Sequence, residues 1–253
     1  MGEPYNRIVV TICVSDVHLG YRHCLREAFL SFLEALAGWR EVGRLVLLGD
    51  IMDMWRRDMA GVVLESAPVL SRLVALPSRI RVYYVAGNHD YHLGGLRNFH
   101  YPFPFSRRLT LREGGVVYRF CHGYEFDPSL SPAYFDALCY TGDGLGGVGG
   151  RAYDGLARVL KRGQGVKEKV ARMLLPPEKR LLSHEEAIHQ RALASVREGE
   201  VLVFGHTHRP FVQGRVANCG SWVADSSPNG TYVVLEKGKL TLETFPGQSV
   251  PER

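Results

Sequence analysis

The sequence lacks the features of a membrane protein, of a disulfide-rich protein and of a secreted protein. No stretch approaches the roughly 18 consecutive apolar residues that a membrane-spanning helix requires, although 45% of the 253 residues are hydrophobic. The five cysteines are scattered and form no Cys-x-x-Cys pair, which argues against a disulfide framework or a thiolate zinc site. The N-terminal stretch MGEPYNRIVV has no basic region followed by an apolar segment and a small-residue cleavage site. We therefore expect a soluble, cytoplasmic protein.

Charge and length narrow the class of partner and the number of domains. The formal net charge is +5 and the isoelectric point is near 9.0, which suits anionic ligands such as phosphates, nucleic acids or an anionic membrane surface. The sequence contains no long basic groove or recognisable nucleic-acid module, so nucleic acid is not the favoured ligand. A chain of 253 residues can bury a substantial core, and we predict a single α/β domain over residues 1–253.

Short apolar, β-branched runs alternate with helical patterns along the chain. Between the first two runs, apolar residues from Leu25 to Leu36 recur at helical spacing, and a second helix is predicted over residues 61–75. This alternation predicts sheets covered by helices, with the functional site at the carboxyl ends of the strands. The predicted strands are RIVVTICVS, RLVLLG, RVYYVAG, VVYRFC and EVLVFG, followed by a hairpin made of TYVVLEKG and KLTLETF.

Each of the five main runs ends in side chains that can bind a cation. Five such endings at the same position relative to a strand are difficult to explain by chance, whereas a single His-x-His could be two polar loop residues. The endings are Asp16-x-His18, Gly49-Asp50-x-x-Asp53, Gly87-Asn88-His89-Asp90, His122-Gly123 and Gly205-His206-x-His208.

The donors in these endings are too numerous for one ion. Two ions that share a bridging carboxylate and a water molecule would each be five- or six-coordinate, as in two-metal hydrolytic sites. Four of the seven donors are histidines, which disfavours magnesium and calcium and favours manganese, iron, zinc, cobalt or nickel. The seven candidate ligands are Asp16, His18, Asp50, Asn88, His122, His206 and His208.

The ordered series SDVHLG, GDIMD, GNHD, HG and GHTH resembles the calcineurin-like metallophosphoesterase superfamily over residues 8–225. The resemblance implies a two-sheet β sandwich flanked by helices, and two divalent transition-metal ions, with manganese as the expected ion. It implies that Asp50 bridges the ions, with Asp16, His18 and His208 on one ion and Asn88, His122 and His206 on the other. It further implies hydrolysis of a phosphodiester or pyrophosphate by attack of a metal-activated hydroxide.

Two further residues are expected to take part in catalysis. His89 is predicted to protonate the leaving group or to stabilise the transition state as a cation. Asp53 resembles the carboxylate that orients this histidine in related phosphatases, although it could instead be a turn residue. Asp90 could either cap a following helix or support the site. The histidines outside the motifs are predicted to be surface or structural residues: His23, His92, His100, His184 and His189.

The motifs GDIMDMW, CHG and NCGSWV look most like the UDP-2,3-diacylglucosamine pyrophosphatase group, which implies a nucleotide-linked lipid as substrate. The chain departs from that group at His89, where the lipid A enzymes carry arginine. A nuclease or a cyclic-nucleotide phosphodiesterase with the same metals is the alternative, and a non-catalytic scaffold is disfavoured because all seven ligands are present. Candidate substrate contacts are Trp55, Arg56, Arg57 and Trp222.

Residues 125–182 interrupt the alternation of strands and helices, and we predict that they form an inserted helical cap with TGDGLGGVGG as its hinge. An apolar helical face flanked by lysines and arginines could contact an acyl chain or an anionic membrane surface, or could pack on the core. That face consists of Val166, Val170, Met173 and Leu174. Ser183-x-x-Glu186 has the pattern of a capping box at the start of the next helix. NFHYPFPF is predicted to be a loop before a hairpin, placed near the site or simply packed on the core.

Overall fold

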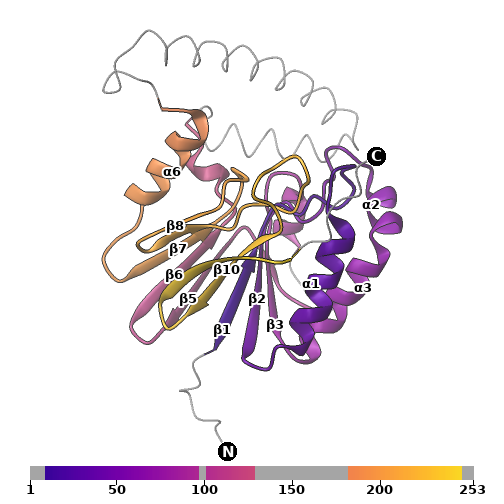
Figure 1. The fold of residues 1–253 in the computed structure, drawn as a ribbon, viewed down its shortest axis with the longest axis horizontal. Coiled ribbons are helices and arrows are strands. Elements are labelled where there is room, and N and C mark those ends of the chain that lie inside the picture. Colours follow the sequence, from indigo (N-terminus) through magenta and orange to yellow (C-terminus); the bar gives the residue numbers. More distant parts are fainter. Residues whose placement is uncertain (1–8, 97–100, 129–181, 247–253) are drawn as a thin grey trace, which may run out of the picture.

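Two β-sheets pack face to face in the computed structural model, which describes residues 9–96, 101–128 and 182–246 (Figure 1). The first sheet has the strand order β11-β10-β1-β2-β3-β4 and the second has the order β5-β6-β7-β9-β8. The first sheet consists of β1 (Val10–Val14), β2 (Val42–Leu48), β3 (Arg81–Val85), β4 (Phe105–Ser106), β10 (Thr231–Glu236) and β11 (Lys239–Thr244). The second consists of β5 (Arg108–Glu113), β6 (Val116–Cys121), β7 (Glu200–Phe204), β8 (Phe211–Gln213) and β9 (Val216–Asn218).

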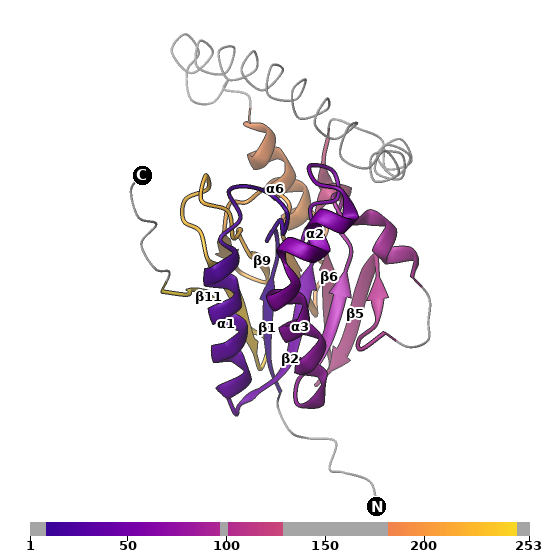
Figure 2. The same cartoon turned by 90° about the vertical axis from the view of Figure 1, so that its right-hand side faces the viewer.

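Helices cover the outer face of each sheet, which makes four layers. Figure 1 shows α1 (Arg26–Gly38), α2 (Met59–Glu65) and α3 (Ala67–Ala75) on one side of the sandwich and α6 (His184–Ala194) on the other, and Figure 2 shows α1 and α3 lying along the first sheet. The predicted fold, a two-sheet sandwich flanked by helices, is confirmed.

The alternation of side chains along the strands divides the core into three parts. In β1, Ile12 and Val14 pack with the helices on the outer face, whereas Cys13 packs between the sheets, because successive side chains of a strand point to opposite faces. On the far face of the second sheet, Ile188 of α6 packs with Phe204 of β7. Both sheets are therefore buried on two faces, which explains why the strands are continuous apolar runs.

Parallel pairing directs the central strands toward one end of the sandwich. β1, β2 and β3 pair in parallel within the first sheet, and β6, β7 and β9 pair in parallel within the second. The carboxyl ends of β1, β2, β3, β6 and β7 are followed by the predicted motifs. The sheet edges are completed by antiparallel pairs, such as β10 beside β1.

The single helix predicted over residues 61–75 is wrong, because the segment forms α2 and α3 with a bend of 76° between them. Asp58 caps α2 by accepting a hydrogen bond from Gly61 N (2.9 Å). Pro68 lies in the first turn of α3, a position that needs no backbone N–H but cannot continue a preceding helix. Within the described ranges, no single helix is long and apolar enough to cross a membrane, and only this bent pair reaches that length and composition together.

Several smaller predictions can be compared with the structure. Ser183 and Glu186 form the predicted capping box at the start of α6. In NFHYPFPF, Phe105 opens β4 and its ring lies 5.0 Å from the ring of Tyr84, so Phe103 and Phe105 pack on the core whereas Tyr101 is exposed. The apolar face of the insertion, its glycine-rich hinge, His100 and Cys139 lie outside the described residues. The other four cysteines are free thiols.

Candidate metal centre

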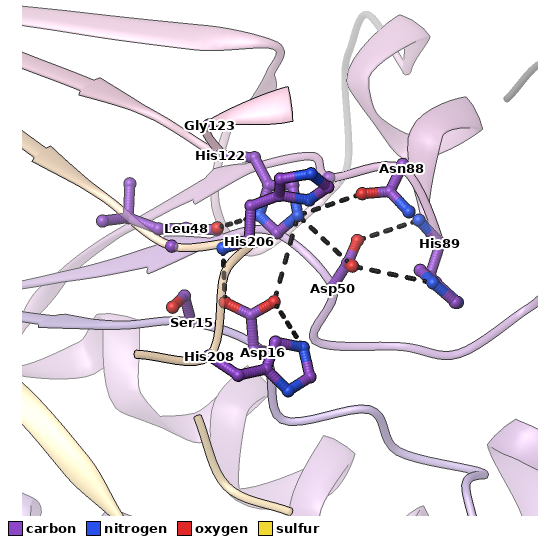
Figure 3. Close-up of polar contacts among 12 residues, drawn as sticks. Ser15, Asp16, Leu48, Asp50, Asn88, His89, His122, Gly123, His206 and His208 are labelled. Atoms are coloured by element: carbon purple, nitrogen blue, oxygen red, sulfur yellow. Dashed lines mark hydrogen bonds and ion pairs between the residues drawn. The ribbon is translucent and has the colours of Figure 1, made fainter. Parts of the chain in front are cut away.

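The carboxyl ends of five strands from both sheets bring the predicted ligands together. Figure 3 labels all of these ligands except His18. β1 is followed by Asp16 and His18, β2 by Asp50, and β3 by Asn88. The second sheet supplies His122 after β6 and the two histidines of GHTH after β7. Most of these side chains are buried, including both aspartates and His122. These polar side chains therefore lie close together, most of them buried, at the end of the sandwich where the carboxyl ends of the strands lie.

Five of the seven candidate ligands have a left-handed backbone conformation. This conformation is uncommon for residues other than glycine and costs about 1–3 kcal/mol at each position. The residues are Asp16 (φ 53°), His18 (φ 55°), Asp50 (φ 52°), His206 (φ 70°) and His208 (φ 57°). The surrounding structure therefore holds these loops in a strained backbone conformation, in which the side chains point toward one another.

Two glycines allow these loops to approach one another. A Cβ atom at Gly87 would overlap Asp50 Oδ1, and a Cβ atom at Gly205 would lie 2.5 Å from Asp16 Oδ2. Side chains at either position would displace a carboxylate of the centre. Each glycine directly precedes a candidate ligand, which explains its place in GNHD and GHTH.

A first group of donors surrounds Asp16. Asp16 Oδ1 lies 3.2 Å from His208 Nε2 and 3.8 Å from His18 Nε2. The Nε2 atoms of His18 and His208 lie 3.2 Å apart. These three residues can place one donor atom each within 4.8 Å of the others, which is the spacing of a metal site.

A second group of donors surrounds His122. His122 Nε2 lies 3.2 Å from Asp50 Oδ2 and 3.2 Å from Asn88 Oδ1. The ring of His206 packs edge-on against His122, with ring centroids 5.1 Å apart. Asp50 Oδ2 also lies 3.9 Å from His18 Nε2, so this carboxylate lies between the two groups.

Hydrogen bonds at the far side of two rings decide which nitrogen faces the centre. His122 Nδ1 donates to Leu48 O at 2.7 Å, because a carbonyl oxygen can only accept. His18 Nδ1 lies 3.0 Å from Asp53 Oδ2 and donates to this carboxylate. In both residues Nε2 faces the centre, where its lone pair would bind a metal ion, which is the usual arrangement of a metal-binding histidine.

The electrostatics of the group favour a cation. Burial alone would raise the pKa of Asp16, but His208 and His122 outweigh this effect and lower it to about 2. The pKa of Asp50 also lies well below its ordinary value, since His122 and His89 outweigh burial. Burial would lower the pKa of His122, but Asp50 and Asp16 raise it to about 10. Two buried carboxylates thus demand positive charge between them.

The residues fit divalent metal ions. Asp16 Oδ1 is buried and has no partner in hydrogen-bonding geometry among the described residues. A buried carboxylate oxygen without a hydrogen bond is costly, and a bound cation would satisfy it. Carboxylate, amide and imidazole donors together suit transition metals more than magnesium or calcium.

Asp53 lies behind the centre and contacts two histidines at once. Its Oδ1 lies 2.9 Å from His89 Nδ1, and its Oδ2 lies 3.0 Å from His18 Nδ1. Its contact with His89 was expected from the sequence, whereas its contact with His18 was not. Arg56 also donates to this carboxylate, through its backbone N (3.0 Å) and through Nη1 (2.5 Å). Asp53 therefore makes both of the contacts that the sequence left as alternatives, one within its own turn and one with the ring of His89.

His89 is held with one nitrogen toward the centre. Its Nδ1 faces Asp53 and its Nε2 lies 3.9 Å from Asp50 Oδ2, and its backbone N donates to Asp50 Oδ1 at 2.8 Å. Burial would lower the pKa of His89, but Asp53 and Asp50 raise it above its ordinary value. The Nε2 atom of His89 thus faces the candidate centre.

Asp90 supports the loops of the centre. Its carboxylate accepts hydrogen bonds from Ile51 N (2.8 Å), Gly87 N (2.6 Å) and the Tyr84 hydroxyl (2.5 Å), and its side chain does not cap the following turn η2 (Tyr91–Gly95). Burial and the nearby Asp50 raise its pKa to about 6. Asp90 therefore ties the loop that carries Asp50 to the loop that carries GNHD.

The four candidate substrate contacts lie in different surroundings. Trp55 is buried, with its ring 4.7 Å from the ring of His89, and Arg56 packs over Tyr21 with a quarter of its side chain exposed. Arg57 forms an exposed ion pair with Glu65.

Trp222 is not a substrate contact, which corrects the sequence prediction. Its side chain is fully buried in the core, and its ring lies 5.1 Å from Phe29 and 5.0 Å from Phe32. The backbone N of Trp222 donates to Asp16 O at 3.0 Å. Trp222 follows the GHTH loop in the sequence, but its side chain points into the core and not toward the candidate ligands.

The GHTH loop is held by hydrogen bonds from residues that the sequence did not single out for this role. Asn218 Nδ2 donates to Gly205 O at 2.6 Å and lies 3.2 Å from Thr207 Oγ1. His189 of α6 contacts the same hydroxyl at 2.8 Å. Asn218 is the last residue of β9 and the first residue of NCGSWV, but no local pattern indicates that it reaches back to this loop.

The chain matches one family model and is similar to several known proteins. A model described as the calcineurin-like phosphoesterase superfamily domain matches residues 10–239. The chain is similar to UDP-2,3-diacylglucosamine hydrolase of Psychromonas ingrahamii, with 24% identity over 93% of this chain and 97% of the relative. A protein of the same name from Bordetella parapertussis is 41% identical over 32% of this chain and 31% of its own length. Among solved structures, the E. coli phosphoesterase Yfce is 20% identical with a TM-score of 0.49, covering 96% of this chain and 97% of that one.

Proposed function

Because the chain belongs to the calcineurin-like phosphoesterase superfamily, we propose that it uses two divalent ions to hydrolyse the diphosphate bond of a nucleotide-linked lipid. The broader activity, metal-dependent hydrolysis of a phosphoester, follows from the family and from the hydrolases to which the chain is similar. The lipid substrate is the finer proposal. It is supported by the shared name of relatives similar over nearly the whole chain.

The observation that carries the proposal is the convergence of buried carboxylates and imidazoles at one point. When bound, divalent ions polarise phosphoryl oxygens and lower the pKa of water so that it can act as a nucleophile near neutral pH. The histidine-rich donor set suits manganese, iron, zinc, cobalt or nickel, and we take manganese as the ion to test first. In the proposed assignment, Asp50 is shared, Asp16, His18 and His208 hold one ion, and Asn88, His122 and His206 hold the other.

His89 would act on the leaving group. Its Nδ1 is held by Asp53, so the proton available for transfer is the one on Nε2. A histidine in this position can protonate the departing oxygen, or stabilise its negative charge as a cation. Arg56, which is partly exposed beside Asp53, would bind a substrate phosphate, and Trp55 would keep the His89 ring in place by stacking.

The test is a substrate panel with protein that has been stripped of metal and reloaded with manganese. The panel contains UDP-2,3-diacylglucosamine, other UDP-sugars, cyclic nucleotides, single-stranded DNA, bis(p-nitrophenyl) phosphate and a monoester. We expect UMP to be released selectively from the lipid substrate, and activity to disappear with chelator and return with metal. Asp50→Asn should abolish turnover, whereas Glu113→Gln, at the partly exposed ion pair with Arg44, should leave turnover unchanged.

Other outcomes of the same panel would redirect the proposal. Cleavage of cyclic nucleotides or DNA in preference to the lipid would assign the same centre to a phosphodiesterase or a nuclease. If only bis(p-nitrophenyl) phosphate is cleaved, the protein is still a phosphoesterase, but the nucleotide-linked lipid is not its substrate. Failure to cleave any substrate with any of the five metals would contradict hydrolysis itself and favour a scaffold.

We also propose that the predicted insertion within 125–182 can be removed without unfolding the sandwich. The described residues on its two sides are close, because Asp127 Oδ2 lies 3.2 Å from His184 Nε2. Replacing residues 129–181 by a short Gly/Ser linker should preserve cooperative unfolding and diester cleavage, since closing such a loop costs little. Loss of cooperative unfolding would contradict an insertion. In the folded variant, a KM for the lipid raised about tenfold or more would indicate acyl contacts, each buried methylene contributing about 0.8 kcal/mol.

A further inference from the structure

Asp127 lies where the described chain leaves the second sheet, directly after the short helix η3 (Tyr124–Phe126). Its side chain is 9% exposed, so the carboxylate has few water contacts. Asp127 Oδ2 lies 3.2 Å from His184 Nε2 and 4.0 Å from His206 Nε2. One buried carboxylate therefore faces two histidines, one of which is a candidate metal ligand.

The placement of this carboxylate decides which nitrogen of His206 can bind metal. In His18 and His122, Nδ1 is engaged by an acceptor and Nε2 faces the centre. In His206 the carboxylate lies on the Nε2 side, so Nε2 would carry the proton and Nδ1 would keep the lone pair. His206 would thus bind its ion through the opposite nitrogen from His18 and His122.

The main chain and the ring of His206 are held by different contacts. Its backbone N donates to Asp16 Oδ2 at 2.8 Å, which fixes the main chain but not the ring. The ring packs edge-on against His122. Asp127 supplies an acceptor that would fix the tautomer of the His206 ring.

We propose that Asp127 is a positioning residue that holds His206 with Nδ1 toward one of the two ions, and that His184 keeps Asp127 in place. The inference rests on the proposed two-metal function, and deepens it by naming a carboxylate outside the five motifs. His184 belongs to the first turn of α6, so contacts from both flanks of residues 129–181 would meet at one metal ligand. The carboxylate plays here the part that Asp53 plays for His18 on the other side of the centre.

The experiment measures metal binding to the full-length protein and to Asp127→Ala, Asp127→Asn and His184→Ala. Titration calorimetry with Mn²⁺, together with elemental analysis after dialysis, gives the affinity and the number of ions. We expect Asp127→Ala to weaken one of two sites by about 10–100-fold and to leave the other unchanged. Asp127→Asn keeps an acceptor oxygen, so its affinity for Mn²⁺ at this site should fall less. His184→Ala should show the smallest loss of affinity.

Two further measurements separate positioning from a general loss of structure. The electron paramagnetic resonance spectrum of the wild type should show a coupled pair of Mn²⁺ ions, and Asp127→Ala should show an isolated ion at the same metal concentration. Asp225→Asn is the matched control, because it is the same type of change as Asp127→Asn and affects an exposed carboxylate that accepts a hydrogen bond from Tyr21. Its two affinities and its spectrum should equal those of the wild type.

The outcomes distinguish the inference from the function on which it rests. A wild type that binds fewer than two ions would overturn the two-metal proposal. A wild type with two sites, combined with unchanged affinities in Asp127→Ala and Asp127→Asn, would overturn the positioning role and leave the function standing. If Asp127→Ala does not fold, the nearly isosteric Asp127→Asn and His184→Ala decide the question by the same measurements.

Discussion

Replacing His89 by alanine is expected to lower kcat by about 10²–10⁴-fold, which is the usual contribution of a general acid, without changing the number of bound ions. The reason is geometric. His89 Nδ1 is bound to Asp53 and its Nε2 faces the centre at 3.9 Å from Asp50, so the ring can deliver one proton without being a ligand. Removing the ring takes away the proton donor and leaves the donors of the ions in place.

The dependence of this effect on the leaving group separates the two roles that the geometry allows. A general acid matters most when the departing oxygen is a strong base, because a weakly basic p-nitrophenolate leaves without a proton. If His89 is the acid, the loss in His89→Ala will be small for bis(p-nitrophenyl) phosphate and large for substrates with poor leaving groups. An equal loss across all substrates would instead assign His89 as a stabilising cation.

A control and a contrary result can be stated for the same experiment. His23→Ala removes a partly exposed histidine whose ring nitrogen contacts Arg22, and it should leave kcat within about twofold of the wild type, as surface changes usually do. If His89→Ala keeps full activity on every substrate, the proposed acid is wrong. If it loses an ion, His89 takes part in metal binding, as its place in one candidate group with His18 and Asp50 would allow.

Replacing Trp222 by alanine is expected to destabilise the fold by about 3–5 kcal/mol, the range for truncating a large buried aromatic side chain. The ring is fully buried between Phe29 and Phe32, so its loss would leave a cavity beneath α1. Urea unfolding measures the effect as a lower midpoint with little change in slope.

Two companion variants make the Trp222 result specific. Trp222→Phe keeps an aromatic ring and removes an indole N–H that has no partner among the described residues, so it should cost much less. Trp39→Ala removes a partly buried tryptophan at the end of α1 and should also cost less than Trp222→Ala. Unchanged stability together with a raised KM would return Trp222 to the substrate site.

Local sequence patterns were sufficient to predict the main strands of the fold. The long apolar runs correspond to β1, β2, β3, β6 and β7, because strands buried on both faces have no need of polar alternation. The bend at Ser66 was missed because both halves of the segment have helical periodicity, and only Pro68 indicates that they are separate. β4, β8 and β9 have two or three residues each, too few for any period to be read.

The convergence of the candidate ligands could be predicted from the sequence, whereas the residues that support them could not. Asp16 and Asp50 occur in recognisable strand endings, whereas the hydrogen bond from Asn218 to Gly205 joins segments that only the folded chain brings together. Asp127 illustrates the same limit, since its partner His184 is 57 residues away in the sequence. The direction of the Trp222 side chain depends on the packing of α1, and for this reason it could not be predicted from the sequence.

The distance in sequence between the two sides of the centre has a consequence for synthesis of the protein. His18 and His208 are 190 residues apart in the chain, and β1 is flanked by β10, one of the last strands to be made. A chain emerging from the ribosome carries only part of the ligands until β7 has been translated, and the edge of β1 stays open until β10 arrives. Such long-range pairing is slow, so we expect the candidate centre to be completed late in folding, and a chain that ends before β7 to lack the donors of GHTH.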